Sequence, residues 1–176
     1  GPGGTRLFQE PEEAGGPRSK PVFADRAGRV WVGVLGAGLS RLEGEVVVRT
    51  GIRSSGGSLG WNVRALFEDR AGEIWAGSSA GLLHLGVSET NWVVLPDGLE
   101  GMTILGIQQT PDGALWSGTD GAGVGILEGE RWRRLRKADG LLHDRVWPLA
   151  VEVDGAIWLG SPLGLTRVRG REIRAV

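Results

Sequence analysis

The chain of 176 residues contains no cysteine, no tyrosine and only two histidines. Without cysteine it can form neither disulfide bonds nor thiolate metal sites. The 20 basic and 21 acidic residues nearly cancel, so the net charge of −1 gives no electrostatic reason to expect a nucleic acid or an anionic membrane as partner. No apolar run approaches the roughly 18 residues of a membrane span, and no sequence resembling a targeting signal opens the chain.

Glycine, by contrast, is abundant at 32 residues, far above the roughly 7% of average proteins. Many of these glycines belong to a motif, Gly-x-hydrophobic-Trp-x-Gly, that occurs four times. Its copies span Gly28–Gly33, Gly72–Gly77, Gly113–Gly118 and Gly155–Gly160. The tryptophans of the motif are Trp31, Trp75, Trp116 and Trp158, at spacings of 44, 41 and 42 residues. A repeat of this length with its own Gly/Trp signature is typical of β-propeller blades.

Each repeat divides into four short apolar segments separated by glycine turns, which predicts four strands. The second strand is the motif itself, and the first precedes it at Val22–Asp25, Val63–Asp69, Ile104–Thr110 and Val146–Glu152. The third strands are predicted at Leu39–Leu42, Leu82–Leu85, Val124–Leu127 and Leu165–Val168. The fourth are predicted at Val46–Arg49, Trp92–Leu95, Arg131–Leu135 and Glu172–Val176. No segment carries a sustained apolar period of 3.6 residues, so we expect almost no helix.

The predicted fold is therefore an all-β propeller of four tandem, four-stranded antiparallel blades of about 42 residues. We place the blades at 21–62, 63–103, 104–145 and 146–176. Residues 1–4 resemble the remnant of a cleaved tag, and 5–20 form an extra strand, at Thr5–Glu10, with a linker. Because a blade cannot bury both apolar faces alone, we expect the four motif tryptophans to form the structural core between blades.

Four blades in an open arc would leave two apolar faces exposed to water. We favour a homodimer in which two copies complete an eight-bladed ring. A four-bladed ring closed on itself, or a fragment of a larger propeller, stays open as the alternative.

The segment N-V-R-A-L-F-E-D-R-A-G-E-I-W-A-G-S-S-A-G-L-L-H-L, Asn62–Leu85, resembles the two-component regulator propeller repeat. The resemblance covers nearly all of Pro21–Val176. It implies the extracytoplasmic, periplasmic or extracellular, sensor domain of a bacterial signalling protein related to hybrid histidine kinases, with a small glycan among the implied ligands. Thr110 and Glu152 stand in the place of Asp25 and Asp69, which leaves the turn intact but argues against an equivalent ligand at every blade.

Nothing in the sequence predicts an enzyme, a catalytic residue, a metal or a cofactor. The D-x-x-G-x-x-W fragment also resembles the Asp-box turn of sialidases, which is structural, and the chain lacks both their arginine triad and a nucleophilic tyrosine. A propeller lyase acting on streptogramin antibiotics has a loosely similar repeat, but its family chemistry needs a histidine–glutamate constellation with a divalent metal. His84 and His143 lie in different settings and do not reproduce it.

Long polar connections between blades, at Ile52–Asn62, Asp97–Thr103 and Asp139–Arg145, predict a ligand-binding face around the central channel. Aromatic and polar groups at such a mouth suit a small glycan or a peptide. The candidates are Trp61, Asn62, Arg64, Asp120, His143, Asp144, Arg145 and Trp147. Alternatively these side chains only plug the channel. The function expected is non-enzymatic ligand sensing, with a purely structural or oligomerising propeller as the second hypothesis and a lyase or hydrolase as the third.

Overall fold

The computed structural model describes residues 21–34, 38–44, 46–50, 52, 61–86, 90–96 and 98–176. These residues form four antiparallel sheets, each a meander of four consecutive strands. Sheet 1 contains β1 (Val22–Ala24), β2 (Val30–Val34), β3 (Gly38–Glu43) and β4 (Val46–Arg49). Sheet 2 contains β5 (Val63–Glu68), β6 (Ile74–Ser78), β7 (Gly81–Leu85) and β8 (Thr90–Trp92). Sheet 3 contains β9 (Ile104–Gln109), β10 (Leu115–Thr119), β11 (Val124–Glu128) and β12 (Arg131–Leu135). Sheet 4 contains β13 (Trp147–Val151), β14 (Ile157–Ser161), β15 (Gly164–Arg169) and β16 (Glu172–Ala175).

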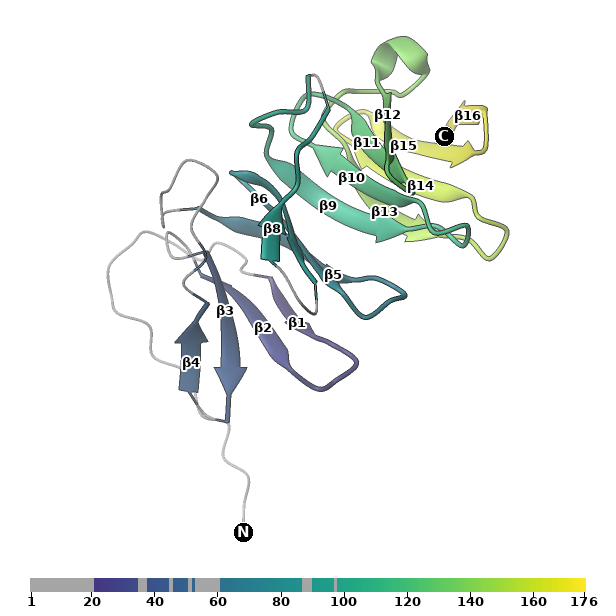
Figure 1. Cartoon of the computed structure of the whole chain (residues 1–176). Helices are drawn as coiled ribbons and strands as arrows, with labels where there is room; N and C mark the ends of the chain where they lie inside the picture. The colour runs from purple at the N-terminus through teal and green to yellow at the C-terminus, as the bar shows by residue number, and fades with distance from the viewer. Residues whose placement is uncertain are drawn as a thin grey trace.

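The all-β prediction is confirmed over this part of the chain, where the one helical element is a single 3-10 turn, η1 (Lys137–Asp139). No helix in the described ranges is long and apolar enough to cross a membrane. The four sheets follow one another in chain order from the lower left to the upper right of Figure 1. Their first strands, β1, β5, β9 and β13, lie beside one another in consecutive sheets. Sheets 1 and 4 therefore form the two ends of a propeller-like row (Figure 1).

The turn between the first and second strand is fastened by a carboxylate. In sheet 2, Oδ1 of Asp69 accepts hydrogen bonds from the N–H groups of Ala71 and Glu73, and Oδ2 accepts one from Nε1 of Trp75 at 2.9 Å. Gly72, with φ of +85°, completes the turn in a conformation that favours glycine. One carboxylate thus closes the turn and satisfies a buried indole N–H, which would be costly to leave unpaired.

Sheets 3 and 4 divide these two tasks between two side chains. Thr110 Oγ1 accepts the hydrogen bond from Nε1 of Trp116 at 3.2 Å, while Asp112 accepts one from the N–H of Ala114 at 3.3 Å. The Thr110 hydroxyl donates in turn to Asp112 at 2.6 Å. The corresponding residues of sheet 4 are Glu152, Asp154, Ala156 and Trp158. The turn consequently survives the loss of its first aspartate.

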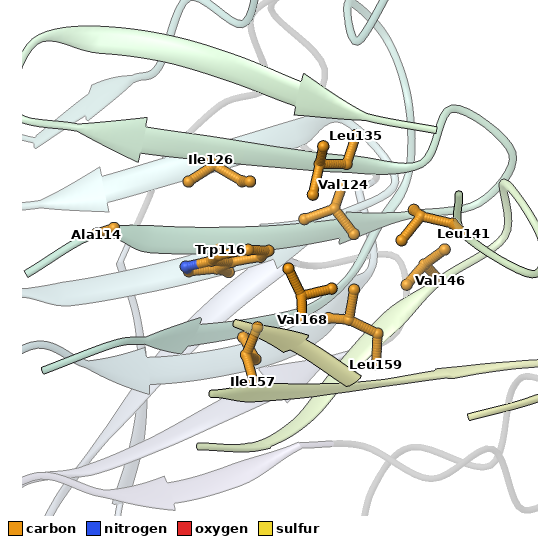
Figure 2. Close-up of a cluster of buried hydrophobic side chains, with 10 residues drawn as sticks. All are labelled: Ala114, Trp116, Val124, Ile126, Leu135, Leu141, Val146, Ile157, Leu159 and Val168. Carbon is orange, nitrogen blue, oxygen red and sulfur yellow. The ribbon is translucent and has the colours of Figure 1, made fainter. Parts of the chain in front are cut away.

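Three hydrophobic clusters fill the spaces between consecutive sheets. In the cluster between sheets 3 and 4, Trp116 and Val124 of sheet 3 face Ile157 and Leu159 of sheet 4 (Figure 2). Trp31 lies in the cluster between sheets 1 and 2, and Trp75 in that between sheets 2 and 3. Among the described residues no further sheet lies in front of Trp158, which is partly exposed. The motif tryptophans of sheets 1, 2 and 3 therefore point towards the sheet that follows in the chain.

We call the face that a sheet turns towards the following sheet its forward face. In sheet 2 it carries Trp75, Gly77 and Leu82, which meet Ile104 of sheet 3. A methyl group on Gly77 would lie 2.7 Å from Cγ2 of Ile104, too close for two carbon atoms. The glycine that ends the motif therefore admits the first strand of the next sheet. The motif glycine pairs with the first aliphatic residue of the third strand, which in sheet 2 is Leu82. We call the place on the forward face over these two residues the seat.

On the side of the first turns, arginines join neighbouring sheets. The N–H of Arg26 donates to Glu68 at 2.8 Å, and its guanidinium reaches the carbonyl of Asp69. Arg70 repeats this towards sheet 3, where its N–H donates to Gln109 at 3.0 Å and its guanidinium reaches a backbone carbonyl. The next turn carries Pro111 in the place of the arginine, so this kind of link is restricted to the first two interfaces.

The fourth strand of sheet 2 differs from its prediction. The sequence places it at Trp92–Leu95, whereas β8 spans Thr90–Trp92. Val93 still donates its N–H to the carbonyl of Leu82 at 2.9 Å, but the chain then turns at Pro96, which has no N–H to donate. The extra strand predicted at Thr5–Glu10 lies outside the described residues.

Candidate functional site

The second turn of each sheet and the connection between sheets meet on one side of the row, here called the loop face. The N–H of Ser79 donates to the carbonyl of Asn62 at 3.0 Å, and that of Asp120 to the carbonyl of Thr103 at the same distance. Between sheets 3 and 4 the N–H of Gly123 donates to the carbonyl of Asp144 at 2.7 Å. Backbone hydrogen bonds therefore hold the second turns and the connections together on the loop face.

Four of the predicted ligand residues come together there. Asp120 and Arg145 pair through their backbones, and Nε of Arg145 lies 3.0 Å from Oδ1 of Asp120. Nδ1 of His143 accepts a hydrogen bond from the N–H of Arg145 at 2.8 Å, and Asp144 accepts one from the N–H of Lys137 at 2.7 Å. Because Nδ1 accepts, a neutral His143 ring carries its proton on Nε2.

The charges of this group remain accessible. The side chains of Arg145 and Asp120 are 51% and 45% exposed, so the ion pair is in contact with water and contributes little to stability. The guanidinium retains donors and the carboxylate retains acceptor positions beyond the pair. The arrangement offers a polar ligand a donor and an acceptor side by side. We call Asp120, His143, Asp144 and Arg145 the loop-face cluster.

Trp61, Asn62 and Arg64 lie instead at the beginning of sheet 2. Trp61 is buried, with 1% of its surface exposed; its Nε1 donates to the carbonyl of Ile52 at 3.1 Å. Its ring meets Trp92 edge-on, with centroids 5.1 Å apart. A ligand contact through Trp61 would require the indole to leave this packing. Asn62 joins the second turn through its backbone, and Arg64 is exposed on β5.

The eighth candidate, Trp147, lies on the forward face of sheet 4. It pairs with Gly160 across β13 and β14, and its indole covers that glycine. Its contacts are thus those of a packing residue at the end of the row, separate from the loop-face cluster.

Two cavities lie at places that the sequence analysis did not single out. One, of about 250 Å³, is lined by Trp31, Arg41, Glu43, Val48 and Thr50. The other, of about 230 Å³, lies at the loop face of sheet 2 and is lined by Ala80, Gly81, Trp92, Val93, Val94, Leu95, Glu100 and Gly101. A tryptophan outside the motif position, Trp92, was the available signal for the second cavity, but the sequence analysis assigned it to a strand.

The two histidines have different surroundings. His84 stacks on Trp75 with ring centroids 4.1 Å apart, and its Nε2 lies 2.7 Å from a carboxylate oxygen of Glu73. His143 belongs to the loop-face cluster between sheets 3 and 4. Over the ranges that the structure describes, no group of three or more histidine, aspartate or glutamate side chains is placed to hold a metal ion.

The chain matches no protein-family profile and no curated protein. Several solved structures share its fold. The extracellular domain of the hybrid two-component system BT3049 from B. thetaiotaomicron is 23% identical with a TM-score of 0.73, over 88% of this chain and 22% of that one. The extracellular domain of BT4673 from the same organism is 16% identical with a TM-score of 0.71, over 88% and 24%. This chain thus spans about a quarter of the length of those domains.

Virginiamycin B lyase from Staphylococcus aureus also resembles the chain, at 15% identity and a TM-score of 0.64, over 88% of this chain and 53% of the enzyme. At these identities the likeness establishes the fold, which is that of extracellular domains and of an enzyme alike. Function has to be argued from the residues themselves.

Proposed function

We propose that the chain is a four-blade segment of a larger β-propeller, with blades of about 42 residues, in the extracytoplasmic sensor part of a bacterial two-component signalling protein. It recognises its ligand without catalysis, through the loop face. The loop-face cluster carries this proposal, because the exposed side chains of Asp120 and Arg145, with His143 beside them, take no part in the packing between the sheets. The fold shared with extracellular domains of B. thetaiotaomicron signalling systems supports it.

The chemistry of the cluster suits a neutral, hydroxyl-rich glycan or a short peptide. Arg145 offers N–H donors, Asp120 offers carboxylate acceptors, and His143 offers Nε2. Since Asp120 and Arg145 already neutralise each other, a ligand need not carry a net charge. Recognition would then rest on hydrogen bonds made at fixed positions on the loop face.

The test is isothermal titration of the whole chain with a panel of neutral oligosaccharides and short peptides. For any probe that binds, Arg145→Ala and Asp120→Ala should each weaken the affinity by about tenfold, because each leaves a hydrogen-bonding partner of the ligand unpaired. The chain offers a matched control. Arg133 and Glu128 form an equally short, similarly exposed pair, also at 3.0 Å, at the opposite end of sheet 3.

Arg133→Ala and Glu128→Ala should leave the affinity unchanged. Equal losses in both pairs of variants would show that binding follows general charge rather than the loop face. Unchanged affinity in the Arg145 and Asp120 variants would place the ligand elsewhere, with the cavity at Trp92 as the next candidate.

Assembly is the second candidate function, and the observation that favours it is the exposure of apolar side chains at the ends of the row. Leu165 on sheet 4 is 39% exposed and Val22 on sheet 1 is 67% exposed. The homodimer that closes an eight-bladed ring stays a prediction. Light scattering coupled to size exclusion tests it: a mass of twice 18.7 kDa supports the dimer, and a mass of 18.7 kDa contradicts it.

A further inference from the structure

The three covered forward faces fill their seats in the same way. The motif glycines Gly33 and Gly77 would meet Val63 and Ile104, respectively, if they carried a methyl group. At Gly118 the same methyl group would overlap the carbonyl of Val146 and lie 2.6 Å from Cδ of Pro148. In each case the occupant is the beginning of the next sheet's first strand, led by a β-branched residue.

In sheets 2 and 3 the residue paired with the motif glycine is small, whereas in sheet 1 it is Pro21, whose ring shares the place over Gly33 with Val63. Ala65 pairs with Gly77 in sheet 2, and Gly106 pairs with Gly118 in sheet 3. A methyl group on Gly106 would already lie 3.1 Å from Cδ of Pro148. A side chain much larger than the proline ring at this position would therefore leave no room for the incoming strand.

Sheet 4 has a tryptophan at this position. Trp147 pairs with Gly160, and Cε2 of its indole lies 2.9 Å from the place of a methyl group on that glycine. The reason is a shift of the β-bulge. In β5 and β9 the unpaired residues are Arg64 and Leu105, five residues before the turn residue that binds the tryptophan, whereas in β13 it is Leu149, three residues before it.

We propose that the indole of Trp147 is a plug in the seat of sheet 4, and that this seat accepts the first strand of a following blade once the plug leaves. The proposal does not depend on ligand recognition at the loop face. The indole of Trp147 and the incoming strand would use the same space over Gly160. Only one of them can therefore occupy the seat at a time.

The remainder of the forward face fits such an occupant. Leu165 is 39% exposed, whereas its counterparts Leu39, Leu82 and Val124 are 1%, 0% and 0% exposed beneath the next sheet. The plug covers the glycine but leaves this leucine partly exposed. A following blade would bury it as the internal sheets bury theirs, and burial of apolar surface favours docking.

The sequence also indicates which blade fits. The seat is filled by the residue six positions before the turn residue, which is Val63, Ile104 or Val146. In the first repeat this position is Ser19, a small polar residue. The first blade of a second copy would therefore fill the seat less well than a further blade that begins with valine or isoleucine. We assign the seat to a following blade of the latter kind.

The test uses a unique thiol and an appended blade. Because the chain has no cysteine, Leu165→Cys introduces a single reporter at the seat. A second copy of residues 136–176, joined directly after Val176, continues the repeat in register, because Val176 occupies the place that Leu135 has in sheet 3. The rate of reaction with N-ethylmaleimide then measures whether the seat is covered, and thermal unfolding measures whether docking stabilises the chain.

We expect the appended blade to slow the reaction of the thiol by about tenfold, because a covered thiol reacts only after local opening. Trp147→Val, in the original copy, should lower the unfolding midpoint of the 176-residue chain but raise that of the extended chain. This reversal of sign is specific to a plug that competes with the appended strand. Val153→Ala, at a fully exposed position of the same sheet, is the control and should change neither quantity.

Three results would overturn the proposal. A thiol that reacts as fast in the extended chain shows that no blade docks, and a midpoint lowered equally in both chains shows that Trp147 is ordinary packing. A reaction rate in the 176-residue chain that falls as protein concentration rises assigns the seat to a second copy. Should the extended chain fail to fold, Trp147→Val in the 176-residue chain must still raise the rate about threefold if the indole covers the seat.

Discussion

The forward faces of sheets 2 and 4 share the motif tryptophan, the motif glycine and the leucine opposite that glycine, in different surroundings. Leu82 and Leu165 hold the same position, yet the first is 0% and the second 39% exposed. Trp75 is 8% exposed beneath sheet 3, whereas Trp158 is partly open to water. For these two positions the difference in exposure comes from the next sheet, which covers sheet 2 but has no counterpart over sheet 4 among the described residues. Burial in a repeat array is supplied by the adjacent unit, so identical residues contribute unequally to stability.

The polar groups differ in a corresponding way. On sheet 2 the indole of Trp75 is covered by the ring of His84, whereas on sheet 4 the residue across from Trp158 is Arg167. Arg167 binds both oxygens of Glu152, at 2.8 and 2.7 Å. The hydrogen bonds from Arg167 and then from Trp158 lower the pKa of Glu152 from its usual 4.5 to about 2. A charged network thus replaces a stacked ring at the end of the row, where water reaches it.

The largest expected effect on the free energy of unfolding is at the two equivalent leucines, Leu82 and Leu165. Leu82→Ala should lower the free energy of unfolding by about 2–5 kcal/mol, since it removes a fully buried side chain and leaves a cavity. Leu165→Ala should cost less than about 1 kcal/mol, because that side chain already lies partly in water. Urea unfolding of both variants measures the difference. Equal losses would mean that the face of sheet 4 is covered in solution.

The motif glycines Gly118 and Gly160 should differ less than the leucines in the free energy of unfolding that an alanine substitution costs. Gly118→Ala places a methyl group against the backbone of Val146 and should cost about 1–3 kcal/mol or more. Gly160→Ala meets the indole of Trp147 and the end of the exposed Leu149 side chain, both of which can rotate away, and should cost under about 1 kcal/mol. Chemical unfolding of the two variants measures their free energies of unfolding and so tests this difference. A cost at Gly160 as large as that at Gly118 would mean that Trp147 cannot move.

The smallest expected effect is on the pH dependence of stability, which the charged network of sheet 4 should change in acid. Because the folded-state pKa of Glu152 lies below its usual value, its ion pair contributes stability above about pH 4.5 that is lost as the pH falls towards 2. Glu152→Gln should therefore remove part of the decline of the unfolding midpoint over this range. The control is Glu172→Gln, an exposed acid on the same sheet that pairs with Arg174. An unaltered pH profile in the Glu152 variant would show that the network is not formed in solution.

The positions of the sheets could be predicted from the sequence because the repeat carries them. Glycine turns and the tryptophan motif recur at each strand boundary, and 15 of the 16 strands overlap their predicted ranges by three residues or more. The exception is β8, which shares only Trp92 with its prediction, since nothing in W-V-V-L says that the chain leaves the sheet there. Local patterns predict strands well when each turn has its own chemistry.

The candidate site was less predictable. Asp120, His143, Asp144 and Arg145 come together because the second turn and the connection between sheets meet, which the repeat implies. The placement of Trp61 and Trp147 depends on pairing across strands and between sheets. A bulge moved by two residues decides which side chain of β13 lies over Gly160. Sequence spacing does not specify such a shift, because register is set by packing with the partner strand.

The division of tasks in the first turns bears on how such repeats can diverge. In sheets 1 and 2 one aspartate serves both the turn and the indole, whereas in sheets 3 and 4 two residues share the work. Replacing Asp69 by threonine alone would leave the turn without its acceptor unless an aspartate also entered at position 71. The two positions must therefore change together, and the unit that can be exchanged between repeats is the whole turn rather than any one of its residues.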